Sequence, residues 1–197
     1  MGLAITILKV RGIARHCTYL YRLPARLLLT SILLQGCTDA PSGVTPVDDF
    51  EVQRFLGDWY EIARLDHSFE RGLANVSANY SLRDDGGISV INSGISSATG
   101  ELSQSEGRAY FVDTKDRGHL KVSFFGPFYG AYVVFEIGSD YNYAFVAGNN
   151  RDYLWLLARQ PNPPQAIRDR FVASAAKLDF LTDQLIWVSH SHSAAVD

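Results

Sequence analysis

Short apolar runs that alternate with polar positions follow one another along the chain from residue 57 onwards. They recur at about ten to twelve residues and are separated by turns rich in glycine, aspartate and asparagine, which is the pattern of antiparallel strands joined as hairpins. The eight runs are residues 59–65, 75–82, 87–95, 107–113, 119–125, 129–137, 141–148 and 153–159. Because a meander loses its exposed edges by closing on itself, we predict an all-β fold, an eight-stranded antiparallel up-and-down β-barrel.

A helical pattern appears only after the eighth run. Four apolar residues recur there at spacings of four, four and three, and so share one helical face: Ile167, Phe171, Ala175 and Leu178. We expect Asn162 to be the N-cap and Pro163 the first residue of a C-terminal helix over about 163–179. A single apolar stripe needs one surface to cover, which the outside of the barrel supplies. Residues 184–190 predict one last strand, and residues 191–197 a flexible tail.

The first 36 residues have the layout of a secretory signal. Basic residues precede an eight-residue apolar run, Leu27–Leu34, and the small Gly36 stands directly before Cys37. The apolar run is too short to span a bilayer as a helix. We therefore expect residues 1–36 to be removed on export, with either an extended basic region or a translation start further along the chain.

The segment Leu34-Gln35-Gly36-Cys37 resembles the lipobox of bacterial lipoproteins, in which cleavage leaves the cysteine as the new N-terminus and lipid chains are attached to it. The resemblance implies lipidation of Cys37; the alternative is a cysteine that lies beside an apolar run by chance. Several acyl chains, at about 0.8 kcal/mol per buried CH₂, hold a protein firmly on a membrane. Thr38 in place of aspartate after the cysteine implies the outer membrane, and the polar residues 37–49 predict a tether between anchor and barrel.

Charge and cysteine content exclude several other functions. Without the five positive charges of residues 1–36, the formal net charge of −3 becomes −8 for residues 37–197, so we do not expect nucleic acid as a partner. The two cysteines, Cys17 and Cys37, both precede the predicted barrel. The barrel therefore holds no disulfide framework, no cysteine-based metal site and no thiol nucleophile. We expect neither a cofactor nor a metal.

Alternation within the runs predicts which side chains face the interior, which in an eight-stranded barrel is large enough for one small ligand. Charged and polar residues such as Arg108, Lys121 and Glu136 mark the outer face of their strands. Counting from these positions, we predict a largely apolar ligand site lined by Ala78, Tyr80, Phe111, Phe124, Tyr129 and Val133.

Three short motifs resemble, in order, those of the lipocalin family: Gly57-Asp58-Trp59 at the start of the first run, Ser139-Asp140-Tyr141 before the seventh and Arg159 at the end of the eighth. Ser139 departs from the threonine that is usual in the family. Across roughly residues 47–190 the chain is similar to the bacterial lipocalins, outer-membrane lipoproteins grouped with plant temperature-induced lipocalins and apolipoprotein D. The resemblance implies a lipocalin domain over residues 50–190, with Arg159 stacked on Trp59 at the closed end as a structural contact.

The motif residues extend the predicted ligand site. With Trp59 facing inward, Glu61 and Ala63 face inward by the same alternation, and Arg159 at the closed end places Trp155 inward. Trp155 and Tyr129 are the leading ligand-lining residues; the alternative is ordinary barrel packing. Because a buried carboxylate is costly, we expect Glu61 either to contact the ligand or to make an internal hydrogen bond with a tyrosine hydroxyl or water.

The resemblance implies a carrier of fatty acids, lysophospholipids or similar amphiphiles that performs no chemistry, serves membrane maintenance or stress response, and allows a homodimer. The alternatives are an enzyme in which Glu61 acts on a lipid, and an envelope interaction module whose barrel is only a scaffold. In the loop of residues 66–72, Phe69 is expected either as a movable lid or as a tucked side chain. His67 stands near Asp66 and Glu70, and we expect this group to be solvated rather than to bind a metal.

Overall fold

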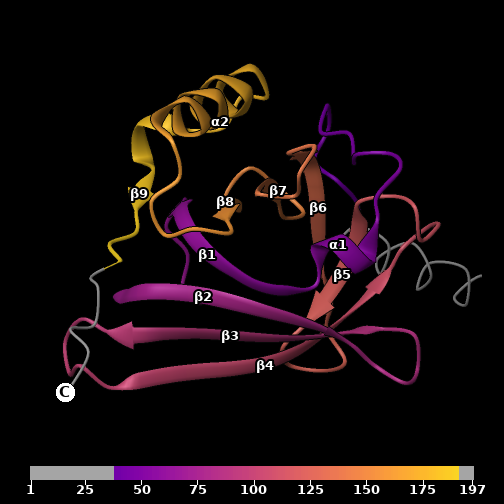
Figure 1. The fold of residues 1–197 in the computed structure, drawn as a ribbon, viewed down its shortest axis with the longest axis horizontal. Coiled ribbons are helices and arrows are strands. Elements are labelled where there is room, and N and C mark those ends of the chain that lie inside the picture. Colours follow the sequence, from indigo (N-terminus) through magenta and orange to yellow (C-terminus); the bar gives the residue numbers. More distant parts are fainter. Residues whose placement is uncertain (1–37, 191–197) are drawn as a thin grey trace, which may run out of the picture.

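The computed structural model describes residues 38–190 and confirms the predicted barrel. Each strand pairs antiparallel with the next along the chain, and β1 pairs with both β2 and β8, which closes the sheet. The strands are β1 (Gly57–Arg64), β2 (Leu73–Leu82), β3 (Ile88–Ser96), β4 (Leu102–Phe111), β5 (His119–Ser123), β6 (Gly130–Ile137), β7 (Tyr143–Ala147) and β8 (Leu154–Ala158). In Figure 1, β2, β3 and β4 form one long wall, β1 runs beside β2, and β7 and β8 lie across from the wall.

One helix covers the outside of the barrel, as predicted. Figure 1 shows α2 (Gln165–Lys177) lying over β1, β7 and β8. Phe171 and Ala175 are fully buried there, and the Phe171 ring packs edge-on against Phe145 of β7 at 5.0 Å. The helix starts later than predicted, with Pro164 in place of Asn162 as its N-cap. After the short η1 (Thr182–Gln184), the two-residue β9 (Ile186–Trp187) pairs with β1.

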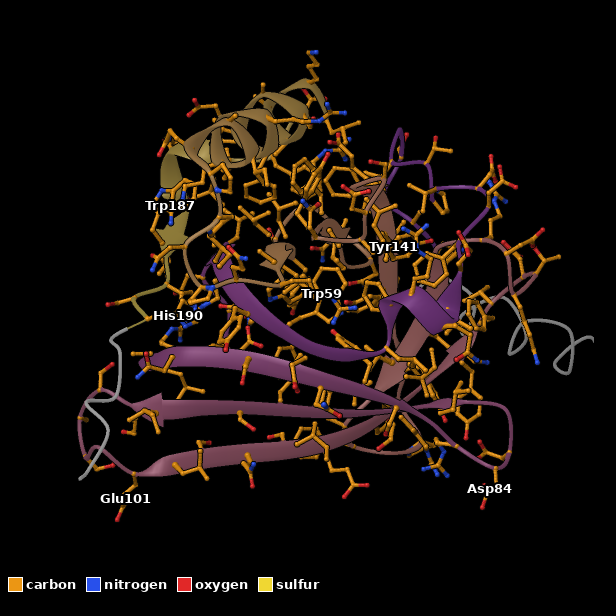
Figure 2. The ribbon with its side chains drawn as sticks, in the orientation of Figure 1. Trp59, Asp84, Glu101, Tyr141, Trp187 and His190 are labelled. Atoms are coloured by element: carbon orange, nitrogen blue, oxygen red, sulfur yellow. The ribbon has the colours of Figure 1, made fainter. Side chains whose placement is uncertain are left out.

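The two ends of the barrel differ. The base is closed by α1 (Val52–Phe55), whose Phe55 ring packs against Trp59 and Tyr80 inside the barrel. The opposite end is open and carries the β1–β2, β3–β4, β5–β6 and β7–β8 loops. In Figure 2, Asp84 in the β2–β3 turn and Glu101 in the β3–β4 turn mark opposite ends of the long wall.

Residues 38–49 do not form the predicted tether, because they lie on the outer wall of the barrel. The carbonyl of Thr38 hydrogen-bonds His119 at 2.8 Å, and that of Ser42 accepts a bond from Arg151 at 2.8 Å. Val44 is buried in the cluster that also holds Phe171, and the Val47 amide donates to a β6 carbonyl. Apolar side chains in an otherwise polar segment therefore fix it in place.

Three sequence predictions lie outside the described residues: the signal over residues 1–36, the lipidation of Cys37 and the flexible tail over residues 191–197. Within residues 38–190, no helix combines the length and the apolar character that a membrane-spanning helix needs.

Candidate functional site

A cavity of about 520 Å³ opens at the mouth of the barrel. Its volume lies in the range of about 300–1,000 Å³ that is usual for small-molecule sites. At its base the hydroxyls of Tyr80 and Tyr132 bond to each other at 2.8 Å, and both rings pack on Phe55. Burial raises the pKa of both hydroxyls, so they stay protonated and offer a neutral, amphipathic floor.

The walls differ in polarity around the cavity. Apolar side chains such as Val90, Val122 and Leu157 lie toward the base, whereas small polar residues from β2, β3 and β4 line the long wall nearer the mouth: Ser77, Asn92, Ser93, Ser103 and Ser105. The lining is largely apolar, as predicted, and its polar residues are concentrated on the long wall. Strand β4 begins five residues earlier than the predicted run, because its polar first half continues the ladder with β3 without any apolar alternation.

Three phenylalanines surround the mouth with their rings largely in solvent. Phe69 comes from the β1–β2 loop, and Phe125 and Phe128 from the β5–β6 loop; their exposed fractions are 60%, 70% and 79%. Apolar rings at the entrance of a cavity are suited to the passage of an apolar chain. Phe69 does not pack inside the protein, so that alternative is wrong. Its action as a movable lid stays a prediction.

A group of polar side chains, the carboxyl cluster, lies against one wall of the cavity. It comprises Glu61, Arg64, His67, Glu70 and Trp155. A β-bulge between Glu61 and Ala63 interrupts the alternation of β1 and allows Arg64 to turn back to the face that carries Glu61. Arg64 donates to the Glu61 carboxylate at 2.6 Å and to the backbone carbonyl of Glu70 at 2.8 Å. Glu61 thus makes an internal hydrogen bond, but its partner is an arginine and not the predicted tyrosine hydroxyl or water.

The β1–β2 loop folds down onto this wall. His67 and Glu70 are buried, and their side chains approach to 3.2 Å, while the Trp155 indole donates to Glu70 at 3.1 Å. The prediction of a solvated loop is therefore wrong for these two residues. It is correct for Asp66, which is exposed and paired with Arg71. Among residues 38–190, no cluster of histidine, cysteine and acidic side chains has the arrangement of a metal site.

The two carboxyls of the cluster have opposite proton affinities. Burial and the neighbouring charge of Glu70 raise the pKa of Glu61 well above its usual range, although Arg64 acts in the other direction. Burial also acts to raise the pKa of Glu70, but the close approach of His67 and the bonds from Glu61 and Trp155 outweigh it and lower this pKa. The opposite pKa shifts favour a protonated Glu61 that shares its proton with an ionised Glu70.

The structure places most of the predicted ligand-site residues on the cavity wall. These are Glu61, Ala78, Tyr80, Phe124, Tyr129 and Trp155. Their contact with a ligand remains a prediction. Tyr129 borders the mouth, but its ring packs on Tyr110 and Lys121 of neighbouring strands and not over the cavity. Phe111 lies inside the barrel below the cavity, beside Phe50.

Two predicted ligand-site residues face the wrong side. Ala63 and Val133 belong to the cluster under α2, outside the barrel. For Ala63 the reason is the bulge in β1; for Val133 it is a second bulge, between Val134 and Glu136 in β6. Glu136 is half-buried under α2 on the outer face, and counting from it by simple alternation therefore assigns the residues before the bulge to the wrong face. Tyr132 and Val134 point inward in place of Val133.

The motif residues close the base of the barrel as the resemblance implies. The Arg159 guanidinium lies 4.0 Å from the centre of the Trp59 ring and donates to the carbonyls of Asp58 and Leu56. Gly57 has a φ of +89°, and a Cβ there would stand 3.6 Å from Arg159. The Tyr141 hydroxyl accepts a bond from the Glu51 amide. Asp140 is exposed in the preceding turn.

Sequence reasoning missed four contributors to the site. Arg64 and Tyr132 were assigned to the outer face, and His67 and Glu70 to solvent. The spacing of Glu61 and Arg64, three residues apart in an otherwise apolar strand, is the signal that could have indicated a buried ion pair. No comparable signal marks His67 and Glu70.

Comparison with known proteins gives a consistent result. Residues 50–190 match the family described as "Lipocalin-like domain". The chain is 55% identical over 163 residues to "Outer membrane lipoprotein Blc" of Vibrio cholerae, a match that covers 82% of this chain and 95% of that protein. Apolipoprotein D of Mus musculus is 35% identical over 129 residues, covering 61% of this chain and 67% of its own. Among solved structures, insecticyanin of the tobacco hornworm aligns with a TM-score of 0.62 at 22% identity, over 80% of this chain and 89% of its own.

Proposed function

Because this chain belongs to the lipocalin family, we propose that it reversibly binds single-chain amphiphiles, such as fatty acids and lysophospholipids, and stores or transports them for membrane maintenance or stress response. The observation that carries the proposal is the cavity of about 520 Å³, open at one end and closed at the other by an aromatic base. Its exposed phenylalanine rim supports entry of an acyl chain.

Hydrophobic burial is large enough to drive such binding. About sixteen methylenes at roughly 0.8 kcal/mol each give a gross gain near 13 kcal/mol. The costs of association and ordering, several kcal/mol, leave a dissociation constant in the nanomolar to micromolar range. A charged headgroup can stay in water at the mouth while the chain occupies the apolar base.

We further propose that the protein works from the outer membrane, held by acyl chains on Cys37. The Vibrio cholerae relative carries the name outer membrane lipoprotein, and the sequence before Cys37 resembles a lipobox. Replacement of Cys37 by serine is expected to release the protein from the membrane fraction of bacterial cells that express it.

The carrier function predicts that protein extracted from its membrane contains fatty acid or lysophospholipid, detected by mass spectrometry. Ala78 lies on the cavity wall, so Ala78→Trp fills part of the cavity and should lower the affinity for a fluorescent fatty acid at least about tenfold. Ala173→Trp, on the exposed side of α2, is the matched control and should bind as the unchanged protein does.

Equal binding by the Ala78→Trp variant, or a protein that takes up no amphiphile, would contradict the carrier function. A cellular phenotype preserved in the filled-cavity variant would favour an interaction module that uses the barrel as a scaffold.

One observation favours a second candidate, lipid chemistry at the carboxyl cluster. Two neighbouring carboxyls with opposite pKa shifts are the arrangement that acid–base catalysis uses, and both border the cavity. Turnover of a lysophospholipid that disappears in Glu61→Gln would establish this activity. We expect no turnover, since the family relatives support a carrier.

A further inference from the structure

The carboxyl cluster carries more acid groups than fixed cations. Glu61 and Glu70 border the cavity, with side chains that are only 4% and 9% exposed. Among the residues that the structure describes, Arg64 is the only arginine or lysine that bonds to either side chain. One buried carboxyl therefore lacks a permanent positive partner. A proton shared by Glu61 and Glu70 balances its charge instead.

An unpartnered buried atom faces the same wall. The His67 side chain is 4% exposed and lines the cavity, and its Nδ1 has no hydrogen-bond partner among residues 38–190. The other ring nitrogen, Nε2, lies 3.2 Å from Glu70, and it too lacks a partner in hydrogen-bond geometry. With its proton on the side of Glu70, the imidazole offers Nδ1 as an acceptor for a donor that arrives in the cavity.

The surroundings of the cluster favour a cation over an anion. The ring centres of three aromatic side chains lie 5.0 to 5.7 Å from the centre of the His67 ring: Phe69, Tyr153 and Trp155. All three border the cavity. Aromatic faces attract an ammonium group. Arg64 is not among the residues that line the cavity. Both of its terminal nitrogens are bonded, and its Nε, although without a partner, is buried behind the wall, so an incoming carboxylate meets Glu61 and Glu70 first.

We propose that the carboxyl cluster is a subsite for the ammonium group of a single-chain amphiphile, with Glu61 and Glu70 as its charge partners and His67 Nδ1 as a further acceptor. This inference rests on the proposed carrier function and adds the headgroup that the cavity prefers. The ammonium takes the place of the shared proton, so binding releases a proton to solvent and leaves the charge of the wall balanced. A fatty acid binds by its chain alone, with its carboxylate at the mouth.

Three ligands with the same chain test the proposal: dodecylammonium, dodecanol and dodecanoate. They displace a fluorescent fatty acid from the full chain carrying Cys37→Ser, after co-purified lipid has been removed, at concentrations below micelle formation. We expect dodecylammonium to bind about tenfold more tightly than dodecanol and more tightly still than dodecanoate. Calorimetry in two buffers of different ionisation enthalpy should show proton release for dodecylammonium only.

Substitutions locate the effect. Glu70→Gln removes the uncompensated charge and should abolish the preference for ammonium over alcohol while the affinity for dodecanol is kept. Glu61→Gln should reduce the preference in the same way and gives an independent result if one variant is poorly folded. Asp66→Asn, an exposed carboxyl of the same loop, is the control and should retain the full preference.

Dodecylammonium that binds no better than dodecanol, or a preference that survives in both glutamine variants, overturns the subsite and leaves the carrier function intact. Failure of all three chains to bind contradicts the carrier function as well.

Discussion

Arg159 stabilises the base of the barrel through several bonds at once. Its guanidinium stacks on Trp59 and donates to the carbonyls of Arg54, Leu56 and Asp58, which joins β8 to α1 and to the start of β1. No other side chain type provides a planar cation with this many fixed donors.

We expect Arg159→Met to lower the free energy of unfolding by about 2–4 kcal/mol, from the lost stacking and the carbonyls left without donors. Arg159→Lys keeps the charge but not the planar set of donors. Its free energy of unfolding should therefore fall by more than half as much as that of Arg159→Met. Urea denaturation of the three proteins measures the difference. A Lys variant as stable as the unchanged protein would show that charge alone accounts for the effect of Arg159.

Glu61 makes stability depend on pH above the usual range of a carboxyl. Since its pKa is raised in the folded protein, the folded state binds a proton that the unfolded state has lost, above about pH 4.3. This contribution to stability is complete below that pH and is lost as pH rises through the folded-state pKa, at a rate of at most about 1.4 kcal/mol per pH unit. The lowered pKa of Glu70 acts in the opposite direction, because its contribution to stability is present above the unfolded-state pKa and is lost as pH falls into the acid range.

The prediction is that the free energy of unfolding falls more steeply with rising pH, above about pH 5, in the unchanged protein than in Glu61→Gln, which has no proton to lose. Denaturant unfolding at a series of pH values measures both slopes. Parallel curves would mean that Glu61 keeps the same pKa on unfolding.

Bulges in two strands change which side chains face the inside of this barrel, compared with the prediction from simple alternation. The bulge in β1 turns Arg64 toward Glu61, and the bulge in β6 brings Tyr132 inward; Ala63 and Val133 lie under α2. The element types, their order and the apolar face of the helix followed from periodicity, because each depends on local pattern. The bulges did not, because an extra residue in one strand shows only against its partner.

The helix α2 should contribute stability without touching the ligand. Phe171 is fully buried between α2 and β7, on the outer side of the barrel wall. Phe171→Ala should cost about 3–5 kcal/mol, whereas Lys177→Ala, exposed on the same helix, should cost little. Thermal unfolding measures the loss, and fatty-acid affinity measured well below the melting temperature should be unchanged. A large loss of affinity in the folded Phe171→Ala variant would show that the helix shapes the cavity.

At the scale of the whole molecule, the closed end was predictable and the mouth was not. The resemblance to the lipocalins implies that Arg159 stacks on Trp59 near Gly57, and the structure has this stacking contact. The site itself depends on how the β1–β2 loop folds onto the wall. That arrangement is set by contacts between residues far apart in sequence, such as Trp155 with Glu70, which no local pattern encodes.

The fixed N-terminal segment has a consequence for how such a protein meets lipid. Thr38 is bonded to His119, the first residue of β5, at the closed-end side of the barrel. An acyl anchor on Cys37 would then be one peptide bond away from Thr38, a residue that is already bonded to the barrel, with no long linker between them. The barrel would then stay close to its bilayer, with its closed end nearer than its mouth to the anchoring leaflet. An amphiphile that leaves the cavity would then enter the space on the side of the barrel away from its anchor.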